Sequence, residues 1–495
     1  MPISRPSRTA LATLAESLGF HLEGAELDQQ AELVGTFIGA FDRVEALPEP
    51  ERPVPARREH CAPDPEENPH GAWVRRTSVR EREGGRLAGR RVALKDNIAL
   101  AGVPMSGGTS FLQGYVPEQD ATVVRRVLDE GGEIVGKAAC EYLSLSAGSH
   151  TSSSGVVHNP RDPSRSTGGS SSGCAAALAA GEVDFAIGGD QGGSIRFPAA
   201  HCGIVGLKPT HGLVPYTGIL SIDAHLDHTG PMTTNVADNA LLLEVIAGPD
   251  GIDTRQQYVR TDRYAAAAGR DAVGLRVGVL EEGFPDSVEP GVERTVRASS
   301  ETLAGAGAHV EAVSIPSHPE LGAAAVPFLI LGGFELVCGG GFATHANLPV
   351  PFGLAEAFER WHEHADAMPA NVKSMLLAGA IAQRSGSRPH YAKALRLRAA
   401  ARAAYDQALR SLDALLMPTT TCTAPPLPAP DANAFEVFAA GGAGIANTSQ
   451  FDVSGHPAIS VPCGEAAGLP VGCMLVARHC DEAILYRLAA AIERG

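Results

Sequence analysis

The stretch Gly188-Gly189-Asp190-Gln191-Gly192-Gly193-Ser194-Ile195-Arg196 says most about the fold class of this 495-residue chain. It follows residues 183–187, a short apolar run that is typical of a buried strand. A serine at the end of a strand, preceded by glycines, is reached by backbone N–H groups with no side chains in the way. An oxyanion hole requires that arrangement. Ser194 is therefore a candidate nucleophile at the end of a sheet strand.

A second glycine-rich turn, Thr167-Gly168-Gly169-Ser170-Ser171-Ser172-Gly173, lies just before the small apolar residues 174–180. Composition alone favours a flexible linker, but the residues that follow predict a close-packed helix. A glycine-rich turn at a helix N-terminus presents free N–H groups, which suits a chemical site. The turn also fits the G-x-S-x-G elbow of α/β-hydrolases, with Ser171 as nucleophile. We reject the elbow because it must follow an apolar strand, whereas residues 158–163 are polar and contain two prolines.

Lys95 follows a third strand-like run, Arg91-Val92-Ala93-Leu94. Burial disfavours the charged form of a lysine, so its pKa falls from about 10.4 towards the range in which a neutral amine accepts protons. Such an amine can activate a serine without histidine or metal. An isolated lysine is more simply interpreted as a surface or ion-pair residue, and the residues alone leave both roles open.

No metal or cofactor is expected. The nine cysteines include no C-x-x-C pair and fit reduced thiols. The stretch His362-Glu363-His364 lacks the i, i+4 histidine spacing of zinc proteases. Residues 131–137 approach a phosphate-binding loop, but Ala138 stands where serine or threonine would hold the metal.

The composition disfavours several partners. A formal net charge of −16 argues against nucleic acid and anionic membrane surfaces, because phosphate groups need a basic face. No secretory signal is visible, and no run approaches eighteen consecutive apolar residues, so no membrane span is expected. We expect a cytoplasmic protein.

Two parts are expected along the chain. Residues 1–85 combine helical patterns with a proline-rich connector, and residues 86–495 alternate strand-like and helical segments. This alternation indicates an α/β sheet with parallel pairs. One helical pattern in the first part places three apolar residues on one face: Leu33, Phe37 and Phe41. After a mostly helical middle, strand signals return at residues 414–417, 458–461 and 472–476. Their return predicts one sheet built from both ends of the chain, with helices and a lid from the middle.

Taken together, these residues resemble the amidase signature family. The family pattern is a strand ending in V-x-x-K-D, then a G-G-S-S turn, then a D-x-G-G-S loop that leads to K-P-T. This chain matches it with Val92-Ala93-Leu94-Lys95-Asp96, with residues 168–173 and with residues 190–210. The separation of Ser170 from Ser194 also matches. The resemblance covers the chain from about residue 87, and an ordered motif of this length is highly specific.

The resemblance implies a mixed β-sheet core covered by helices and a serine-hydrolase mechanism. Neutral Lys95 accepts a proton from Ser170, which accepts one from Ser194 as Ser194 attacks the amide carbonyl. Water then cleaves the resulting acyl-enzyme. In the family, a cis peptide bond precedes the residue that matches Ser170. The implied oxyanion hole consists of the backbone N–H groups of Gln191, Gly192, Gly193 and Ser194, and the implied supporting residues are Ser171, Asp190 and Arg196.

Within the family, the loop of this chain is similar to that of the enantioselective amidases that follow nitrile hydratase in nitrile breakdown. Those enzymes carry an N-terminal helical extension used in dimerisation, and residues 1–85 resemble it. A homodimer that acts on a small-molecule amide is therefore implied. Three residues depart from the family pattern: Ser172 replaces glycine, Cys174 replaces serine and His201 replaces an aromatic residue. The first two should be tolerated, whereas His201 is a candidate to alter the pocket and leaves the substrate open.

Other functions on the same scaffold stay open. An acyltransferase would pass the acyl group to an amine or hydrazine, and related hydrolases would cleave esters, carbamates or hydrazides. A binding or scaffolding protein without activity is disfavoured by the intact Lys95, Ser170 and Ser194. A component of a glutamine-dependent tRNA amidotransferase is disfavoured by the motif variant and the N-terminal extension.

Overall fold

The computed structural model describes residues 3–48, 57–341, 352–386 and 388–495. The chain divides into two compact units, Met1–Val54 and Pro55–Gly495.

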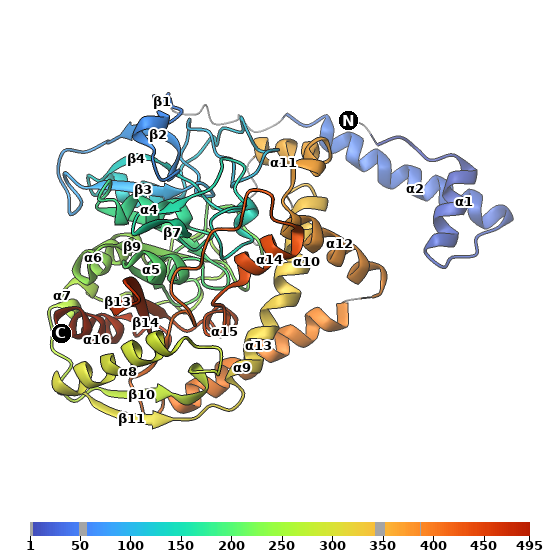
Figure 1. Cartoon of the computed structure of the whole chain (residues 1–495). Coiled ribbons are helices and arrows are strands. Elements are labelled where there is room, and N and C mark those ends of the chain that lie inside the picture. The colour runs from blue at the N-terminus through green and yellow to red at the C-terminus, as the bar shows by residue number, and fades with distance from the viewer. Residues whose placement is uncertain (1–2, 49–56, 342–351, 387) are drawn as a thin grey trace. The chain divides into compact units, whose positions relative to one another are not determined.

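The first unit consists of two helices, α1 (Arg8–Ser17) and α2 (Gly24–Glu45), drawn in blue in Figure 1. Ser7 caps α1, because its hydroxyl accepts a hydrogen bond from the N–H of Ala10. An ion pair of 2.6 Å between Arg8 and Asp28 joins the helices. The predicted apolar face of α2 is exposed at Leu33, Phe37 and Phe41.

The second unit begins before the boundary expected near residue 85. Residues 57–85 contribute β1 (His60–Cys61) and β2 (Trp73–Val79) to the main sheet, where β2 pairs antiparallel with β4 (Glu133–Ala138). The side chain of Trp73 is buried, and its Nε1 donates a hydrogen bond to Glu182. This segment therefore belongs to the sheet, and its proline-rich composition gives no sign of these edge strands.

Twelve strands form one mixed sheet in the order β1-β2-β4-β3-β7-β9-β8-β13-β14-β12-β10-β11. Those not yet introduced are β3 (Arg91–Lys95), β7 (Phe185–Asp190), β8 (Val205–Lys208), β9 (His228–Thr233), β10 (Arg276–Leu280), β11 (His309–Val313), β12 (Ala414–Pro418), β13 (Ala458–Ala466) and β14 (Leu469–Ala477). A separate pair is formed by β5 (His158–Asn159) and β6 (Asp162–Ser166). β3 is parallel to both of its neighbours, whereas β13 and β14 are antiparallel to theirs. The expected α/β class is confirmed, and β12, β13 and β14 lie in the same sheet as β3 and β7, as the sequence predicts.

Helices cover both faces of this sheet (Figure 1). Side chains alternate between the faces, so in β3 Leu94 joins one core and Ala93 joins the other. The first face packs against α3 (Thr122–Asp129), α6 (Val236–Ile246), α7 (Tyr264–Ala268), α8 (Pro290–Gly305) and α16 (Glu482–Arg494). The second packs against α4 (Ser172–Ala179), α5 (Arg196–Cys202), α10 (Ala325–Cys338), α13 (Arg388–Ala408) and α15 (Ser449–Ser454). The further helices are α9 (His318–Leu321), α11 (Phe352–Glu359), α12 (Ala370–Arg384) and α14 (Ala434–Gly442).

One helical stretch, His318–Cys338, is long and apolar enough to cross a membrane by length and composition alone. No such segment is expected from the sequence. Within this stretch, Phe328 is buried in the core around α13 and α15, and Leu336 and Val337 are buried in another apolar cluster. Helices of a protein core pass the same composition test, so no membrane span is inferred from it.

Candidate active site

The three residues predicted for catalysis lie at one edge of the sheet. Lys95 is the last residue of β3, and Ser194 follows the end of β7. These strands are parallel neighbours, so their carboxyl ends meet at the same edge. Ser170 precedes α4, and the N–H of Ser171 donates to the carbonyl of Ser194 at 3.2 Å. That bond brings the two glycine-rich turns together.

The environment of Lys95 favours a neutral amine. The side chain is fully buried, with Nζ 2.7 Å from Ser170 Oγ and 3.2 Å from the carbonyl oxygen of Gly189. Among the described residues, Lys95 forms no ion pair. Burial therefore lowers the pKa of Lys95. A neutral amine in contact with a serine hydroxyl can accept its proton.

Ser170 is held between Lys95 and the loop that carries Ser194. The peptide bond between Gly169 and Ser170 is cis, as the family resemblance implies. Position 169 requires glycine, because a Cβ there would collide with the carbonyl oxygen of Gly148. The side chain of Ser170 is fully buried, and among the described residues its hydroxyl is hydrogen-bonded to Lys95.

Ser171 is placed away from the cavity. Its hydroxyl donates to the carbonyl of Gly189 and accepts from the N–H of the same residue, both at 3.2 Å. Both bonds fasten the turn to β7, and the side chain is fully buried. The hydroxyl of Ser171 is therefore engaged with β7, and Ser171 does not line the cavity beside Ser194.

Asp190 and Arg196 hold the backbone of the catalytic loop. Asp190 accepts hydrogen bonds from the N–H groups of Gly193 (2.5 Å) and Ile195 (3.0 Å), and the guanidinium of Arg196 donates to both of its oxygens at 3.0 Å. Although burial opposes ionisation, the Arg196 guanidinium keeps the pKa of Asp190 well below its usual range. The loop is thus fixed around an ion pair.

This geometry changes the expected oxyanion hole. Four backbone N–H groups were implied, but that of Gly193 is already bonded to Asp190. Within the described part of the chain, the N–H groups of Gln191, Gly192 and Ser194 donate to no other protein group. These three remain for an oxyanion. The φ of +135° at Gly193 lies in the region that favours glycine.

Two residues of this network are not predicted from the sequence. Asp452 accepts from Arg196 at 2.6 Å, and Thr448 accepts from Arg196 through its carbonyl while its hydroxyl donates to the carbonyl of Gly192. Both come from the segment that forms α15, more than 250 positions further along the chain. No pattern local to residues 448–452 indicates that these residues contact Arg196.

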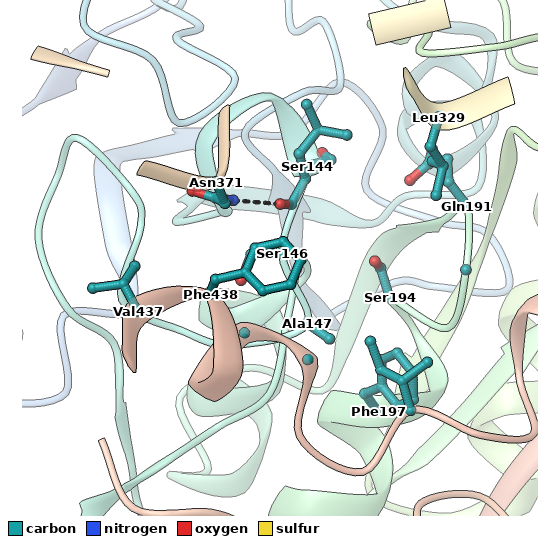
Figure 2. Close-up of a pocket in the computed structure, with 15 residues that line it drawn as sticks. Ser144, Ser146, Ala147, Gln191, Ser194, Phe197, Leu329, Asn371, Val437 and Phe438 are labelled. Carbon is teal, nitrogen blue, oxygen red and sulfur yellow. Dashed lines mark hydrogen bonds between the residues drawn. The ribbon is translucent and has the colours of Figure 1, made fainter. Parts of the chain in front are cut away.

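Ser194 opens into a cavity of about 270 Å³, shown in Figure 2. Among the described residues, no charged side chain lines the cavity. Asn371 donates to the carbonyl of Leu145 at 2.6 Å, which leaves its own carbonyl oxygen without a partner among the described residues. The side-chain carbonyl oxygen of Gln191 is likewise unpartnered there. The apolar lining comes from Leu145, Ala147, Phe197, Leu329, Val437, Phe438 and Ile445.

His201 does not line the cavity. It is buried in α5, with its ring against Gly168. Burial lowers the pKa of His201 to about 4, so the ring is neutral near pH 7. The expectation that His201 alters the pocket is therefore not met by direct contact. The residue instead packs beneath the turn that carries Ser170.

Comparison with known proteins agrees with this architecture. The family model described as Amidase matches residues 69–485, and the chain belongs to this family, the amidase signature enzymes. The chain is 40% identical to an enantioselective amidase of Rhodococcus rhodochrous, over 99% of this chain and 95% of that protein.

Two solved structures are also similar. The peptide amidase of Stenotrophomonas maltophilia matches with a TM-score of 0.67 and 32% identity, over 83% of each chain. One component of the glutamyl-tRNA(Gln) amidotransferase of Thermotoga maritima matches with a TM-score of 0.71 and 31% identity, over 86% of this chain and 88% of that one. The family and its amidase members identify this chain as an enzyme that hydrolyses amide C–N bonds.

Proposed function

We propose that this enzyme hydrolyses small, uncharged, apolar carboxamides through Lys95, Ser170 and Ser194. The observation that carries the proposal is the buried 2.7 Å contact between Lys95 and Ser170, with no carboxylate partner for the lysine among the described residues. This contact lies beside the loop from which Ser194 faces an uncharged cavity (Figure 2).

Acylation would begin with proton transfer along the three side chains. Neutral Lys95 takes the proton of Ser170 as Ser170 takes that of Ser194, whose oxygen bonds to the carbonyl carbon. The developing oxyanion is stabilised by the N–H groups of the loop, namely those of Gln191, Gly192 and Ser194. When the C–N bond breaks, the proton returns along the same path to the leaving nitrogen.

Deacylation reverses the roles. Water gives a proton to the same relay and attacks the acyl carbon, and the carboxylic acid leaves as Ser194 recovers its proton. Each cycle thus consumes one amide and one water, and restores the lysine to its neutral form. An amine or hydrazine in place of water would give acyl transfer, so product analysis with added hydroxylamine measures both outcomes.

The lining of the cavity supports an apolar acyl group. A substrate carboxylate or ammonium would lose its hydration there and find no counter-charge among the described residues, at a cost of several kcal/mol. The unpartnered oxygens of Gln191 and Asn371 can each accept an N–H of the substrate. We therefore expect uncharged amides to be preferred over glutamine.

The test compares matched substrates and serine variants. We expect kcat/KM for aliphatic and aromatic primary amides to exceed that for glutamine by at least about a hundredfold, since several kcal/mol of desolvation separate the two. Ser194→Ala should abolish turnover and fluorophosphonate labelling while the fold is kept. Labelling that persists in Ser194→Ala and disappears in Ser171→Ala would refute the assignment.

We further propose that the first unit forms a homodimer interface. Leu33, Phe37 and Phe41 leave an apolar face on α2 exposed to solvent, and such faces are commonly buried in an interface. The Rhodococcus enzyme aligns over 99% of this chain and so includes the same segment.

A further inference from the structure

We propose that Asp406, His456 and His479 form a binding site for a divalent transition-metal ion, with Zn²⁺ as the ion of best fit. The hydrolytic mechanism uses none of these residues. The proposal rests on the convergence of three ligand atoms from three separate segments, and on a lone pair of His479 that faces Asp406 and meets no hydrogen-bond donor among the described residues.

The three side chains meet near the end of α15. Asp406 lies on α13, His456 follows α15, and His479 lies between β14 and α16. One ligand atom of each lies within 4.8 Å of those of the other two. Asp406 Oδ1 is 3.1 Å from His456 Nε2 and 3.9 Å from His479 Nδ1. A tetrahedral zinc ion holds its ligand atoms about 3.3 Å apart. The pair at 3.9 Å must therefore close by about 0.6 Å, and the two imidazole nitrogens by at most about 1.5 Å.

His479 presents an unused lone pair to this centre. Its Nε2 lies 3.2 Å from the carbonyl oxygen of Ser454, which can only accept a hydrogen bond. The proton of the neutral ring is therefore on Nε2, and Nδ1 carries a lone pair. That lone pair faces Asp406 Oδ1, a second acceptor, at 3.9 Å, which is too long for a hydrogen bond. A cation between them removes the repulsion.

His456 is held in the same way. Its Nδ1 is 3.0 Å from the hydroxyl of Ser454, and its Nε2 faces Asp406. A hydrogen bond from Nε2 to Asp406 accounts for this ring without an ion. When a metal takes Nε2, the ring proton moves to Nδ1 and is donated to the Ser454 hydroxyl. Metal-bound histidines usually donate their second nitrogen in this manner, so Ser454 orients both rings.

The surroundings indicate which ion fits and what competes with it. Two imidazoles and one carboxylate favour Zn²⁺ over Mg²⁺ or Ca²⁺, which prefer oxygen ligands. His479 also lines a cavity of about 300 Å³, from which water can complete the coordination. Arg402 opposes the ion, because its Nε lies 3.8 Å from Asp406 Oδ2 and already offers that carboxylate a positive charge.

The experiment measures metal binding by the full-length enzyme, apart from its activity. Protein stripped with EDTA and then freed of chelator is titrated with Zn²⁺ in competition with a chromophoric chelator, and with Co²⁺ for its visible spectrum. We expect one equivalent of Zn²⁺ to bind in the micromolar range or tighter, Mg²⁺ not to compete, and bound Co²⁺ to show d–d bands without a sulfur charge-transfer band. A sulfur band would overturn the proposal, because it would place the ion on one of the nine free cysteines.

Four variants sharpen the test. His479→Asn and Asp406→Asn alter partly exposed residues and should each weaken Zn²⁺ binding at least about tenfold. Arg402→Gln should strengthen it, since the competing charge is removed. His309→Asn, on an exposed edge strand, is the matched histidine control and should bind as wild type does. Absence of zinc binding by wild type, or wild-type affinity in His479→Asn, would overturn the proposal.

Discussion

Two buried lysines on adjacent strands, Lys95 and Lys137, have different surroundings. Both are fully buried, and β3 and β4 pair in parallel with Lys95 opposite Ala138. Lys137 Nζ lies 3.3 Å from a carboxylate oxygen of Asp96 and donates to the carbonyl of Ile98 at 2.6 Å. Lys95 has only the hydroxyl of Ser170 and one carbonyl among the described residues.

The difference shows that burial alone does not make a lysine a base. Burial lowers the pKa of both amines, but the carboxylate of Asp96 opposes that effect at Lys137. An amine that is paired with a carboxylate holds its proton, and an amine that faces a hydroxyl can take one. We therefore propose Lys95 as the base and a structural role for Lys137.

The largest expected effect follows loss of the base. Lys95→Ala should lower kcat for a primary amide by at least about a thousandfold, because no other group on the described residues takes the proton of Ser170. Lys95→Arg should not restore activity, since guanidinium stays charged. Steady-state rates on a matched amide and ester measure this, and the ester should suffer less because its leaving group needs less help from a proton donor. Substantial amide turnover by the arginine variant would contradict the assignment.

Removal of the other lysine should affect stability instead. Lys137→Met leaves the carboxylate of Asp96 buried without its partner, at an expected cost of about 3–5 kcal/mol in the free energy of unfolding. Turnover per folded molecule should change only severalfold. Denaturant unfolding and active-site titration check the two statements. A stable but inactive Lys137→Met would exchange the roles of the two lysines.

The pH dependence should carry the signature of Lys95. Because burial lowers the pKa of Lys95, the base is neutral above that pKa, and kcat/KM should rise with pH through it and then level. The contribution of Lys95 to stability has the opposite sign to that of a lysine in an ion pair, whose pKa is raised on folding. The unfolded chain binds the proton more readily, so this residue destabilises the folded enzyme as pH falls below the unfolded pKa. A pH–rate profile that is flat from acid to alkaline pH would contradict a lysine base.

A smaller effect is expected at the wall of the cavity, away from the lysines. Phe438→Ala should raise KM for apolar amides about three- to tenfold and leave kcat nearly unchanged, because the ring lines the cavity but does not touch the relay. Phe435→Ala is the control, since Phe435 lies on the same helix, is exposed and does not line the cavity. If the two substitutions raised KM equally, the effect would come from a change in the structure of α14 and not from contact between Phe438 and the substrate.

The smallest effect on catalysis is expected in the first unit. Phe37→Ser should convert a dimer to a monomer while kcat changes little, since no described residue of this unit lines the cavity. Light scattering of wild type and variant at micromolar concentration measures the change. Wild type that is already monomeric would end the dimer proposal.

The sequence predicted those parts of the site that are local in the chain. A strand, a glycine-rich turn and the serine behind it lie within a few positions of one another, so β7, Ser194 and the turn before α4 could be predicted together. The three late strands also followed from their apolar runs. Other features depend on distant partners: Asp452 and Thr448 contact Arg196 although about half of the chain separates them from it. The periodicity of apolar residues predicts helices and strands, but it does not show which distant residues come into contact.

The structure differs from the sequence-based expectation at two other points, the boundary between the units and the N–H of Gly193, and both differences also arise from contacts that a local pattern does not show. The strands β1 and β2 are recruited by pairing with β4, which composition cannot show, so the sequence boundary near residue 85 lies inside the second unit. The N–H of Gly193 is taken by Asp190 because the loop curls around that carboxylate. A motif gives the residues of a loop, but the direction of each N–H depends on the backbone angles.

The order of the strands in the sheet has a consequence for folding during synthesis. β13 and β14 stand between β8 and β12, so the middle of the sheet is filled by the pair of its strands that leaves the ribosome last. Until β13 arrives, β8 lacks one neighbour. Arg196 lacks Asp452 until α15, which directly precedes β13, has been made. Pairing between distant segments is slow, because the ends of a long loop must first meet. A nascent chain that already displays both serines therefore still lacks two interior strands of the sheet and one of the groups that hold the loop of Ser194.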